Sequence, residues 1–162
     1  MGAGKSSVGR ALAELSSRTF VDTDLLIQFR LGRPIPQIFQ IYGEEAFRDH
    51  ETSILRSLEP DTCVLSTGGG IVLRDANWHE LHRLGTVIYL KSSVEKIISR
   101  LEASKKKRPL LLTEEWPERV KEILDKREDL YMKADLVVEL DQDDVASGAA
   151  RVLESLKDKG LA

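Results

Sequence analysis

The sequence predicts an α/β fold in which helices cover both faces of a parallel β-sheet. Its four most apolar segments are continuous rather than alternating, as is typical of strands that are buried on both faces. Segments with helical spacing separate them, which favours parallel connections. Polar or glycine-rich stretches follow two of these segments, at the sheet edge where ligands bind in such folds. The expected strands lie around residues 19–22, 63–66, 87–90 and 136–140.

The N-terminal half contains helices that are bounded by glycine and proline. Residues 7–15 form the first helix, and residues 25–31 form a second that ends at Gly32-Arg33-Pro34, because neither glycine nor proline continues a helix easily. A third starts near residue 36 and ends at Gly43. A fourth, over residues 44–58, has apolar residues spaced to face a core.

The C-terminal half contains four further helices. Gly85 ends the first of them, and Ser92-Ser93 precede the second, where a hydroxyl can cap the first turn. The third begins near Trp116-Pro117, because proline suits a first turn. The fourth is amphipathic. These helices are expected over residues 77–84, 94–102, 115–134 and 145–159.

Length and composition describe one ordinary domain. A chain of 162 residues can bury a sizeable core, and we expect residues 1–162 to form a single domain. The net charge of −3 gives no support for bulk binding to nucleic acid or to an anionic membrane, and no apolar stretch reaches the roughly 18 residues of a membrane span. The single cysteine excludes a disulfide framework and favours a reducing compartment. We expect a cytoplasmic location and a monomer.

The first seven residues carry a candidate phosphate site. Gly4-Lys5-Ser6 is the second half of the motif G-x-x-x-x-G-K-[ST], although the triplet alone is a weak signal. Glycines let backbone N–H groups approach phosphate oxygens, and the following helix adds its N-terminal dipole. Lys5 supplies a charge for the β- and γ-phosphates, and the Ser6 hydroxyl can ligate Mg²⁺. The expected nucleotide-binding residues here are Gly2, Ala3, Gly4, Lys5, Ser6 and Ser7.

The first positions of that motif would lie upstream of Met1. The first glycine would stand five residues before Gly4, and the apolar strand that normally feeds such a loop would precede it. We interpret the start at Met1 as a truncation within the motif. A fifth strand would then be missing, and we expect its neighbours in the sheet to lack a partner.

Two aspartates follow the first strand. Either Asp22 or Asp24 can cap the next helix, which is the interpretation we favour for the pair alone. In a functional interpretation they give Mg²⁺ a carboxylate, directly or through water, and give an acceptor hydroxyl a base or an orienting group. The two interpretations are compatible, because one aspartate can cap while the other binds.

Three glycines follow the second strand. A simple turn needs only one or two glycines, and each one adds to the entropy that folding must overcome. Gly68-Gly69-Gly70 is therefore better explained by close approach of the backbone to a ligand.

Charged residues elsewhere allow structural and functional interpretations. Arg48 and Glu51 stand one helical turn apart, and they form either a surface ion pair of little value or an oriented arginine that binds a substrate carboxylate. The residues alone leave these two open. The run from Lys105 to Arg108 is either a solvated loop or a lid that brings an arginine onto nucleotide phosphates. Arg127, taken alone, is expected to face solvent.

Together these motifs resemble those of shikimate kinases. They follow the family's order from Met1 to about Tyr131, whereas other small-metabolite kinases share the phosphate loop without the rest of the set. The matching motifs are Gly-Ala-Gly-Lys-Ser-Ser-Val-Gly-Arg (2–10), Asp-Thr-Asp (22–24), Ile-Phe (38–39), Gly-Glu-Glu-Ala-Phe-Arg-Asp-His-Glu (43–51), Ser-Thr-Gly-Gly-Gly (66–70), Arg-Pro-Leu-Leu (108–111) and Arg-Glu-Asp-Leu-Tyr (127–131).

The resemblance implies a fold and a reaction. The fold would be the three-layer P-loop NTPase type of the nucleoside monophosphate kinases. A substrate-binding region would span about residues 24–52, and a mobile lid about residues 103–116. The reaction would be ATP + shikimate → ADP + shikimate 3-phosphate, in aromatic amino-acid biosynthesis. ATP and Mg²⁺ are then the expected cofactors, and shikimate is the expected partner.

The resemblance also implies roles on the nucleotide side of the reaction. Lys5 and Ser6 would hold phosphate and Mg²⁺, and Asp22 would lie near the metal, through water. Arg108 would come down from the lid onto the nucleotide. Lys5 and Arg108 are therefore expected catalytic residues.

On the acceptor side, Asp24 would bind the shikimate hydroxyls and orient or deprotonate the attacking one. Arg48, supported by Glu51, and Arg127 would hold the shikimate carboxylate. The backbone of Gly68, Gly69 and Gly70 would contact the substrate. The side walls of this pocket would be Phe39 and Phe47.

Two other functions stay open at this point. A gluconate kinase would share the phosphate loop, but it would not need three glycines or two arginines for a carboxylate. A catalytically inactive, nucleotide-binding regulatory domain would have no use for a complete acceptor site. An ATPase assay with and without shikimate distinguishes the three.

Overall fold

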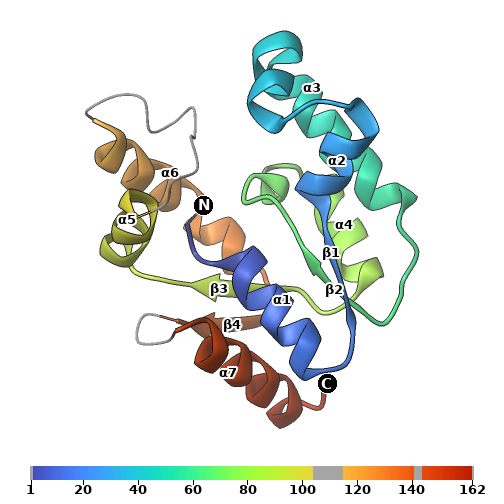
Figure 1. Cartoon of the computed structure of the whole chain (residues 1–162), viewed down its shortest axis with the longest axis vertical. Coiled ribbons are helices and arrows are strands. Elements are labelled where there is room, and N and C mark those ends of the chain that lie inside the picture. Colours follow the sequence, from blue (N-terminus) through green and yellow to red (C-terminus); the bar gives the residue numbers. More distant parts are fainter. Residues whose placement is uncertain (1, 104–114, 141–143, 162) are drawn as a thin grey trace.

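The computed structural model of the chain describes residues 2–103, 115–140 and 144–161 (Figure 1). The strands in these ranges are β1 (Thr19–Asp22), β2 (Cys63–Ser66), β3 (Ile88–Lys91) and β4 (Leu136–Glu139). The helices are α1 (Lys5–Leu15), α2 (Thr23–Leu31), α3 (Ile35–Ser57), α4 (Asp75–Leu84), α5 (Val94–Glu102), α6 (Trp116–Tyr131) and α7 (Val145–Asp158). A short 3₁₀ helix, η1 (Ile71–Leu73), follows the three glycines.

All four expected strands are confirmed, and each expected helix is found close to its expected bounds. The helices expected on either side of Gly43 are continuous in α3 except at Gly43 itself, which has φ 80° and ψ 174°. A residue with positive φ is most easily glycine, so this position breaks the helix as the sequence indicated. η1 was not expected, because three residues leave no periodic pattern.

The strands form two separate parallel pairs. β1 pairs with β2 from Thr19 opposite Cys63 onward, and β3 pairs with β4 from Ile88 opposite Leu136 onward. Within the described ranges β2 and β3 have one strand partner each and do not pair with one another. The expected parallel α/β architecture is confirmed, with its sheet divided into two halves. Helices α2, α3 and α4 lie around β1 and β2, whereas α5, α6 and α7 lie by β3 and β4 (Figure 1).

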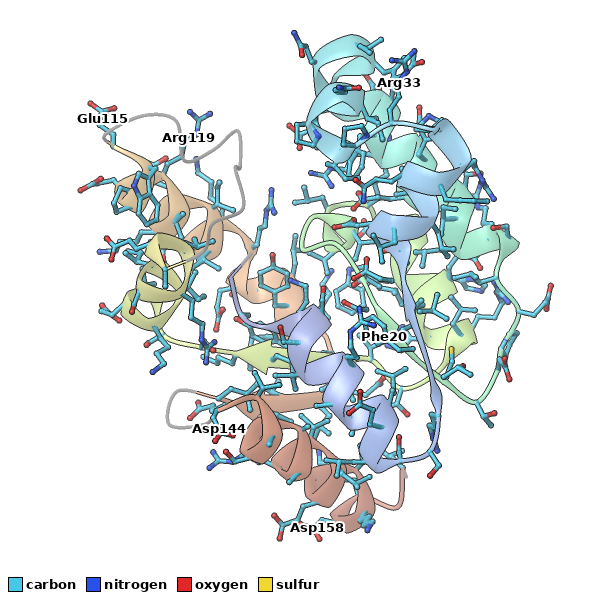
Figure 2. All side chains as sticks on the ribbon, viewed as in Figure 1. Phe20, Arg33, Glu115, Arg119, Asp144 and Asp158 are labelled. Carbon is cyan, nitrogen blue, oxygen red and sulfur yellow. The ribbon has the colours of Figure 1, made fainter. Side chains whose placement is uncertain are left out.

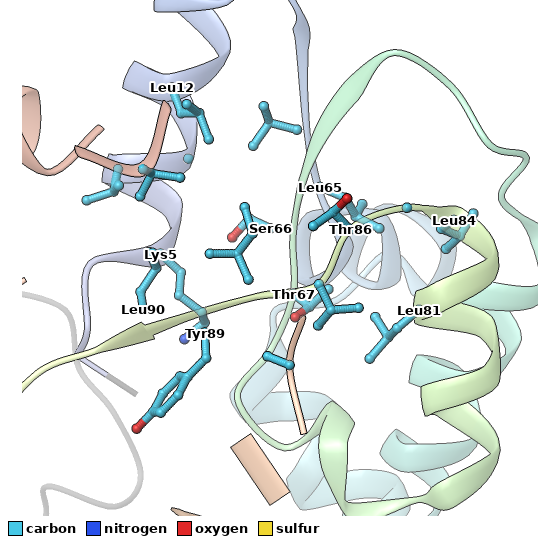
Figure 3. Close-up of a pocket in the computed structure, with 18 of the residues that line it drawn as sticks. Lys5, Leu12, Leu65, Ser66, Thr67, Leu81, Leu84, Thr86, Tyr89 and Leu90 are labelled. Carbon is cyan, nitrogen blue, oxygen red and sulfur yellow. The ribbon is translucent and has the colours of Figure 1, made fainter. Parts of the chain in front are cut away.

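An apolar cavity of about 400 Å³ lies between the two pairs of strands (Figure 3). Its wall includes every residue of β2 and most of β3. Helices α1, α4 and α7 contribute further apolar side chains, among them Leu12, Leu81 and Val152. At one end the wall reaches Lys5 and Gly69, so the cavity borders the phosphate loop and the three glycines.

Helix α1 packs against both halves. On one side Val8 and Leu12 belong to an apolar cluster with residues of β4 and α7. On the other side Gly9 lies against β1, because a Cβ there would stand only 3.1 Å from the Phe20 ring. The Arg10 guanidinium lies 4.6 Å from the centre of the same ring, and Phe20 is seen beside α1 in Figure 2. The helix that follows the phosphate loop therefore connects the two pairs of strands.

Candidate active site

The phosphate loop has the backbone conformation that its glycines allow. Gly2 and Gly4 have φ of 76° and 87°, where side chains are disfavoured. A Cβ on Gly2 would also stand 2.9 Å from Ile97, so the loop needs glycine there in order to pack on α5. Among the described residues no side chain caps α1 at Gly4, so the helix starts without a side-chain acceptor at its N-terminus. Such a helix start is suited to bind a phosphate group.

Asp22 performs two tasks that the sequence analysis allowed to fall on separate aspartates. Its Oδ1 atom accepts hydrogen bonds from the backbone N–H groups of Asp24 at 3.0 Å and Leu25 at 3.4 Å, so it caps α2. Its Oδ2 atom accepts a hydrogen bond from the Ser6 hydroxyl at 2.9 Å. The Ser66 hydroxyl, at the end of β2, lies 3.5 Å from that of Ser6.

The oxygen atoms around Ser6 fit a magnesium ion in kind. Mg²⁺ prefers oxygen ligands and usually takes only one or two from carboxylates, with the rest from phosphate and water. Ser6 and Asp22 supply a hydroxyl and a carboxylate beside the phosphate loop. Across the three described ranges there is no cluster of three histidine, cysteine or acidic side chains that could hold a metal by themselves.

Asp24 presents a buried carboxylate to the space beside the phosphate loop. Among the described residues its Oδ1 atom has no hydrogen-bond partner. Burial raises the pKa of Asp24 above its ordinary value, and the negative charge of Asp22 adds to the rise. The positive charges of Lys5 and Arg48 act in the opposite direction. An unpaired buried acceptor carries a free-energy cost.

Arg48 is held by two glutamates rather than lying on the surface. Its Nη1 atom donates to Glu51 at 2.6 Å, and its Nη2 atom donates to Glu44 at 2.8 Å. Glu51 has no exposed area, and only 13% of the Arg48 side chain is exposed. Burial raises the pKa of Glu51, although the charge of Arg48 opposes the rise. Of the two interpretations left open by the sequence, the geometry therefore favours the oriented arginine.

The three glycines let these charged groups approach the backbone. A Cβ on Gly68 would stand 2.9 Å from Oδ1 of Asp24 and 2.9 Å from Oε1 of Glu51. A Cβ on Gly70 would collide with the guanidinium of Arg48. The close approach expected of this loop thus involves the protein's own side chains, and two of its glycines are needed for that reason.

Arg127 reaches the same loop from the other side. Taken alone it was expected to face solvent, but its Nη1 atom donates to the carbonyl oxygen of Gly69 at 3.5 Å. The Tyr131 hydroxyl donates to that oxygen at 2.7 Å. Arg48 on α3 and Arg127 on α6 therefore both meet the glycine loop, although 79 positions separate them in the sequence.

Two phenylalanines pack beside Arg48. The ring centres of Phe39 and Phe47 are 4.5 Å apart, and the rings are tilted by 35°. The Arg48 guanidinium lies 5.4 Å from the centre of the Phe47 ring. Arg108 and most of the expected lid, residues 104–114, lie outside the described residues.

Comparison with known proteins identifies the chemistry for which these residues are suited. The family model described as shikimate kinase matches residues 1–157. The chain belongs to the shikimate kinase family. The reaction of this family is ATP-dependent phosphorylation of the 3-hydroxyl of shikimate, in aromatic amino-acid biosynthesis.

Individual shikimate kinases match over nearly the whole chain. Shikimate kinases of Prochlorococcus marinus and Pseudomonas putida are each 43% identical, over 96% and 97% of this chain and 81% and 92% of their own lengths. The solved structure of the Acinetobacter baumannii shikimate kinase in complex with shikimate superposes with a TM-score of 0.92 at 37% identity, and covers 100% of this chain and 91% of its own. The solved structure of the Bacteroides thetaiotaomicron shikimate kinase superposes with a TM-score of 0.88 at 31% identity, and covers 97% of this chain and 94% of its own.

Three residues at the site were not singled out from the sequence. Glu44 and Ser66 contact Arg48 and Ser6. Tyr131 was part of a matched motif, but it was given no role. Its position four residues after Arg127 was the available signal, because side chains at i and i+4 share one face of a helix.

Proposed function

We propose that this chain transfers the γ-phosphoryl group of ATP to the 3-hydroxyl of shikimate, with Asp24 as the residue that receives the acceptor hydroxyl. The observation that carries this proposal is the partly buried carboxylate of Asp24, which is influenced by the charges of both Lys5 and Arg48. Lys5 belongs to the phosphate side of the site and Arg48 to the acceptor side. Asp24 is therefore the carboxylate at which the two sides meet.

Arg48 and Arg127 hold the shikimate carboxylate. A guanidinium matches a carboxylate in a two-point hydrogen bond, and two guanidinium groups give the acceptor one orientation. Glu51 and Glu44 orient Arg48, and the backbone of Gly68, Gly69 and Gly70 supplies close contacts at the same place. Shikimate in the structure of the Acinetobacter baumannii relative supports this choice of acceptor.

The nucleotide is held by the phosphate loop. Lys5 and Arg108 neutralise charge on the transferring phosphoryl group, while the backbone N–H groups of residues 2–7 bind phosphate oxygens. Ser6, and Asp22 through water, would hold Mg²⁺, which would supply charge stabilisation to the phosphate groups. Asp22 also orients the Ser6 hydroxyl, so the metal ligand is fixed before the nucleotide arrives.

Positioning dominates the chemical step. The acceptor hydroxyl donates a hydrogen bond to Asp24, and as the oxygen attacks the γ-phosphorus its proton passes to that carboxylate. A raised pKa makes Asp24 a stronger base than an ordinary aspartate. The arginines fix the far end of the acceptor, which aligns its hydroxyl with the phosphoryl group.

We also propose how this chain is organised and where it works. Residues 1–162 form one domain, with substrate-binding residues over about 24–52 and a lid over about 103–116. The protein is a cytoplasmic monomer. None of the helices in the described ranges combines the length and the apolar composition that a bilayer crossing requires.

A coupled ADP-release assay tests the reaction with shikimate, with gluconate and without acceptor. Shikimate-dependent turnover is expected, whereas turnover with gluconate would contradict the proposal. Absence of ADP release with every acceptor and without one would favour the inactive regulatory domain. Lys5→Ala and Arg108→Ala should lower turnover, while Arg48→Ala and Arg127→Ala should mainly raise the shikimate KM. An unchanged shikimate KM in both of the last two variants would refute the carboxylate assignment.

A further inference from the structure

Helix α6, which carries Arg127, is attached to both pairs of strands near its C-terminal end. Tyr131 lies in its last turn and contacts Gly69, which follows β2. The Tyr131 ring also stacks on Tyr89 of β3, with ring centres 5.0 Å apart and an angle of 24° between the rings. Gly69, Tyr89 and Tyr131 all line the cavity. Tyr131 therefore connects the two halves where the cavity meets the site.

Glu128, which follows Arg127 in the sequence, attaches α6 to β3. Its Oε2 atom accepts a hydrogen bond from the Tyr89 hydroxyl at 2.9 Å. Its Oε1 atom lies 2.8 Å from Nζ of Lys91, which also belongs to β3. Burial and the adjacent carboxylate both raise the pKa of Tyr89, so its hydroxyl stays a proton donor at physiological pH. These bonds hold the turn that contains Arg127 independently of Gly69.

Tyr131 and Arg127 share one acceptor. The carbonyl oxygen of Gly69 lies 2.7 Å from the Tyr131 hydroxyl and 3.5 Å from Nη1 of Arg127. The shorter contact has the length of a good hydrogen bond between oxygens, while the longer one is weak. The tyrosine thus supplies the main hydrogen bond of this carbonyl, and the guanidinium keeps its donors for another partner.

Loss of the Tyr131 hydroxyl would leave the Gly69 carbonyl without its main hydrogen-bond donor. A partly buried carbonyl without its donor costs free energy, and Arg127 already contacts this carbonyl at 3.5 Å. A guanidinium drawn towards a backbone carbonyl is less available to a substrate carboxylate.

We propose that Tyr131 is a positioning residue for shikimate: its hydroxyl occupies the Gly69 carbonyl and so leaves Arg127 free to bind the shikimate carboxylate. The proposal rests on the proposed function, in which Arg127 binds that carboxylate. Tyr131 acts through Arg127 and Gly69 and does not itself contact the reacting atoms.

Tyr131→Phe tests the role directly, because it keeps the ring that stacks on Tyr89 and removes only the hydroxyl. The shikimate KM, and the Kd for shikimate measured by calorimetry, should both rise roughly three- to tenfold, the range expected for one hydrogen bond. The ATP KM, kcat and Tm should stay within measurement error. Ser16→Ala is the control, because it also removes a hydroxyl that donates to a backbone carbonyl, that of Leu12 at 2.6 Å, at the C-terminal end of α1.

Two further variants separate positioning from general support of the helix. Tyr89→Phe loosens Glu128 but leaves the Tyr131 bond to Gly69 intact, so its effect on shikimate affinity should be smaller. Tyr131→Phe should add no further loss of affinity in an Arg127→Ala background, because it acts through that arginine.

Several results would overturn the inference. These are an unchanged shikimate affinity in Tyr131→Phe, an equal loss in Tyr89→Phe, or an additive loss in the double variant. If Arg127→Ala weakens shikimate binding while Tyr131→Phe does not, only the inference fails. If Arg127→Ala itself leaves shikimate affinity unchanged, the carboxylate assignment in the proposed function fails as well.

Discussion

The Ser6 hydroxyl donates a hydrogen bond to Oδ2 of Asp22 across 2.9 Å, while Oδ1 of the same carboxylate caps α2. One side chain therefore fixes both the expected metal ligand on α1 and the helix that carries Asp24. The geometry of the phosphate side and that of the acceptor side are coupled through this residue, which leads to a first prediction.

Asp22→Asn should weaken Mg²⁺ binding, while the free energy of unfolding should change little. The amide oxygen can still accept a capping bond, but the charge near the metal is lost. Groups that orient a metal ligand typically contribute 10- to 100-fold to affinity, so the Mg²⁺ concentration for half-maximal rate should rise by roughly that factor. Initial rates across free Mg²⁺ measure it. Asp144→Asn, which alters the cap of α7 seen in Figure 2, is the control and should leave that concentration unchanged.

Gly70→Ala should impair shikimate binding through Arg48. The backbone at Gly70 has φ −92° and ψ −4°, which alanine adopts easily, so the added Cβ acts only by its collision with the guanidinium. Overpacking of this kind costs about 1–3 kcal/mol, and the Kd for shikimate by calorimetry should rise roughly fivefold or more. In an Arg48→Ala background the same substitution should have little effect. An equal loss in both backgrounds would show that the glycine acts in another way.

Arg48→Ala should also destabilise the fold. Glu51 is fully buried, and removal of Arg48 leaves its charge without a partner. Breaking a buried pair from one side costs about 3–5 kcal/mol in free energy of unfolding, and Glu51→Gln in the same chain should restore part of it. Urea unfolding measures both variants. The matched control is Arg74→Ala, whose pair with Asp49 is partly exposed and should contribute less than about 1 kcal/mol.

The raised pKa of Asp24 makes part of the stability depend on pH. The folded protein holds this proton at a pH where the unfolded chain has lost it, so the free energy of unfolding falls as pH rises from the ordinary value of 3.8 through the raised pKa. Glu51 acts in the same direction, from its ordinary value of 4.5. Asp24→Asn should therefore flatten this fall, as measured by urea unfolding at a series of pH values. Parallel curves for the two proteins would contradict the pKa shift.

Local features of the fold could be predicted because they depend on local residues. Gly43 breaks α3 and Gly85 ends α4 because glycine adopts conformations that other residues avoid, and Ser93 caps α5 with its hydroxyl. The dual role of Asp22 could not be assigned, because its second partner, Ser6, lies 16 positions away. The contact between Tyr131 and Gly69, 62 positions apart, is of the same kind.

The candidate site combines features set by local residues with contacts between residues that are distant in sequence. The burial of Glu51, which favours the oriented arginine at Arg48, arises from packing that one helical turn does not reveal. The side of α6 that faces the glycine loop could not be read from a charged helix, and so Arg127 needed the family resemblance. The division between β2 and β3 is a matter of strand pairing, which depends on backbone partners distant in sequence.

The division of the sheet has a consequence for α1. Within the described ranges no strand pairing connects β1 and β2 with β3 and β4. Helix α1, which begins at Lys5, packs on both pairs and so links the phosphate loop to each of them. A substitution such as Leu12→Ala would leave a cavity in this packing, and it should loosen the position of α1 as well as the core. The position of the phosphate loop relative to the two pairs of strands thus depends on residues packed along α1, such as Leu12 and Gly9.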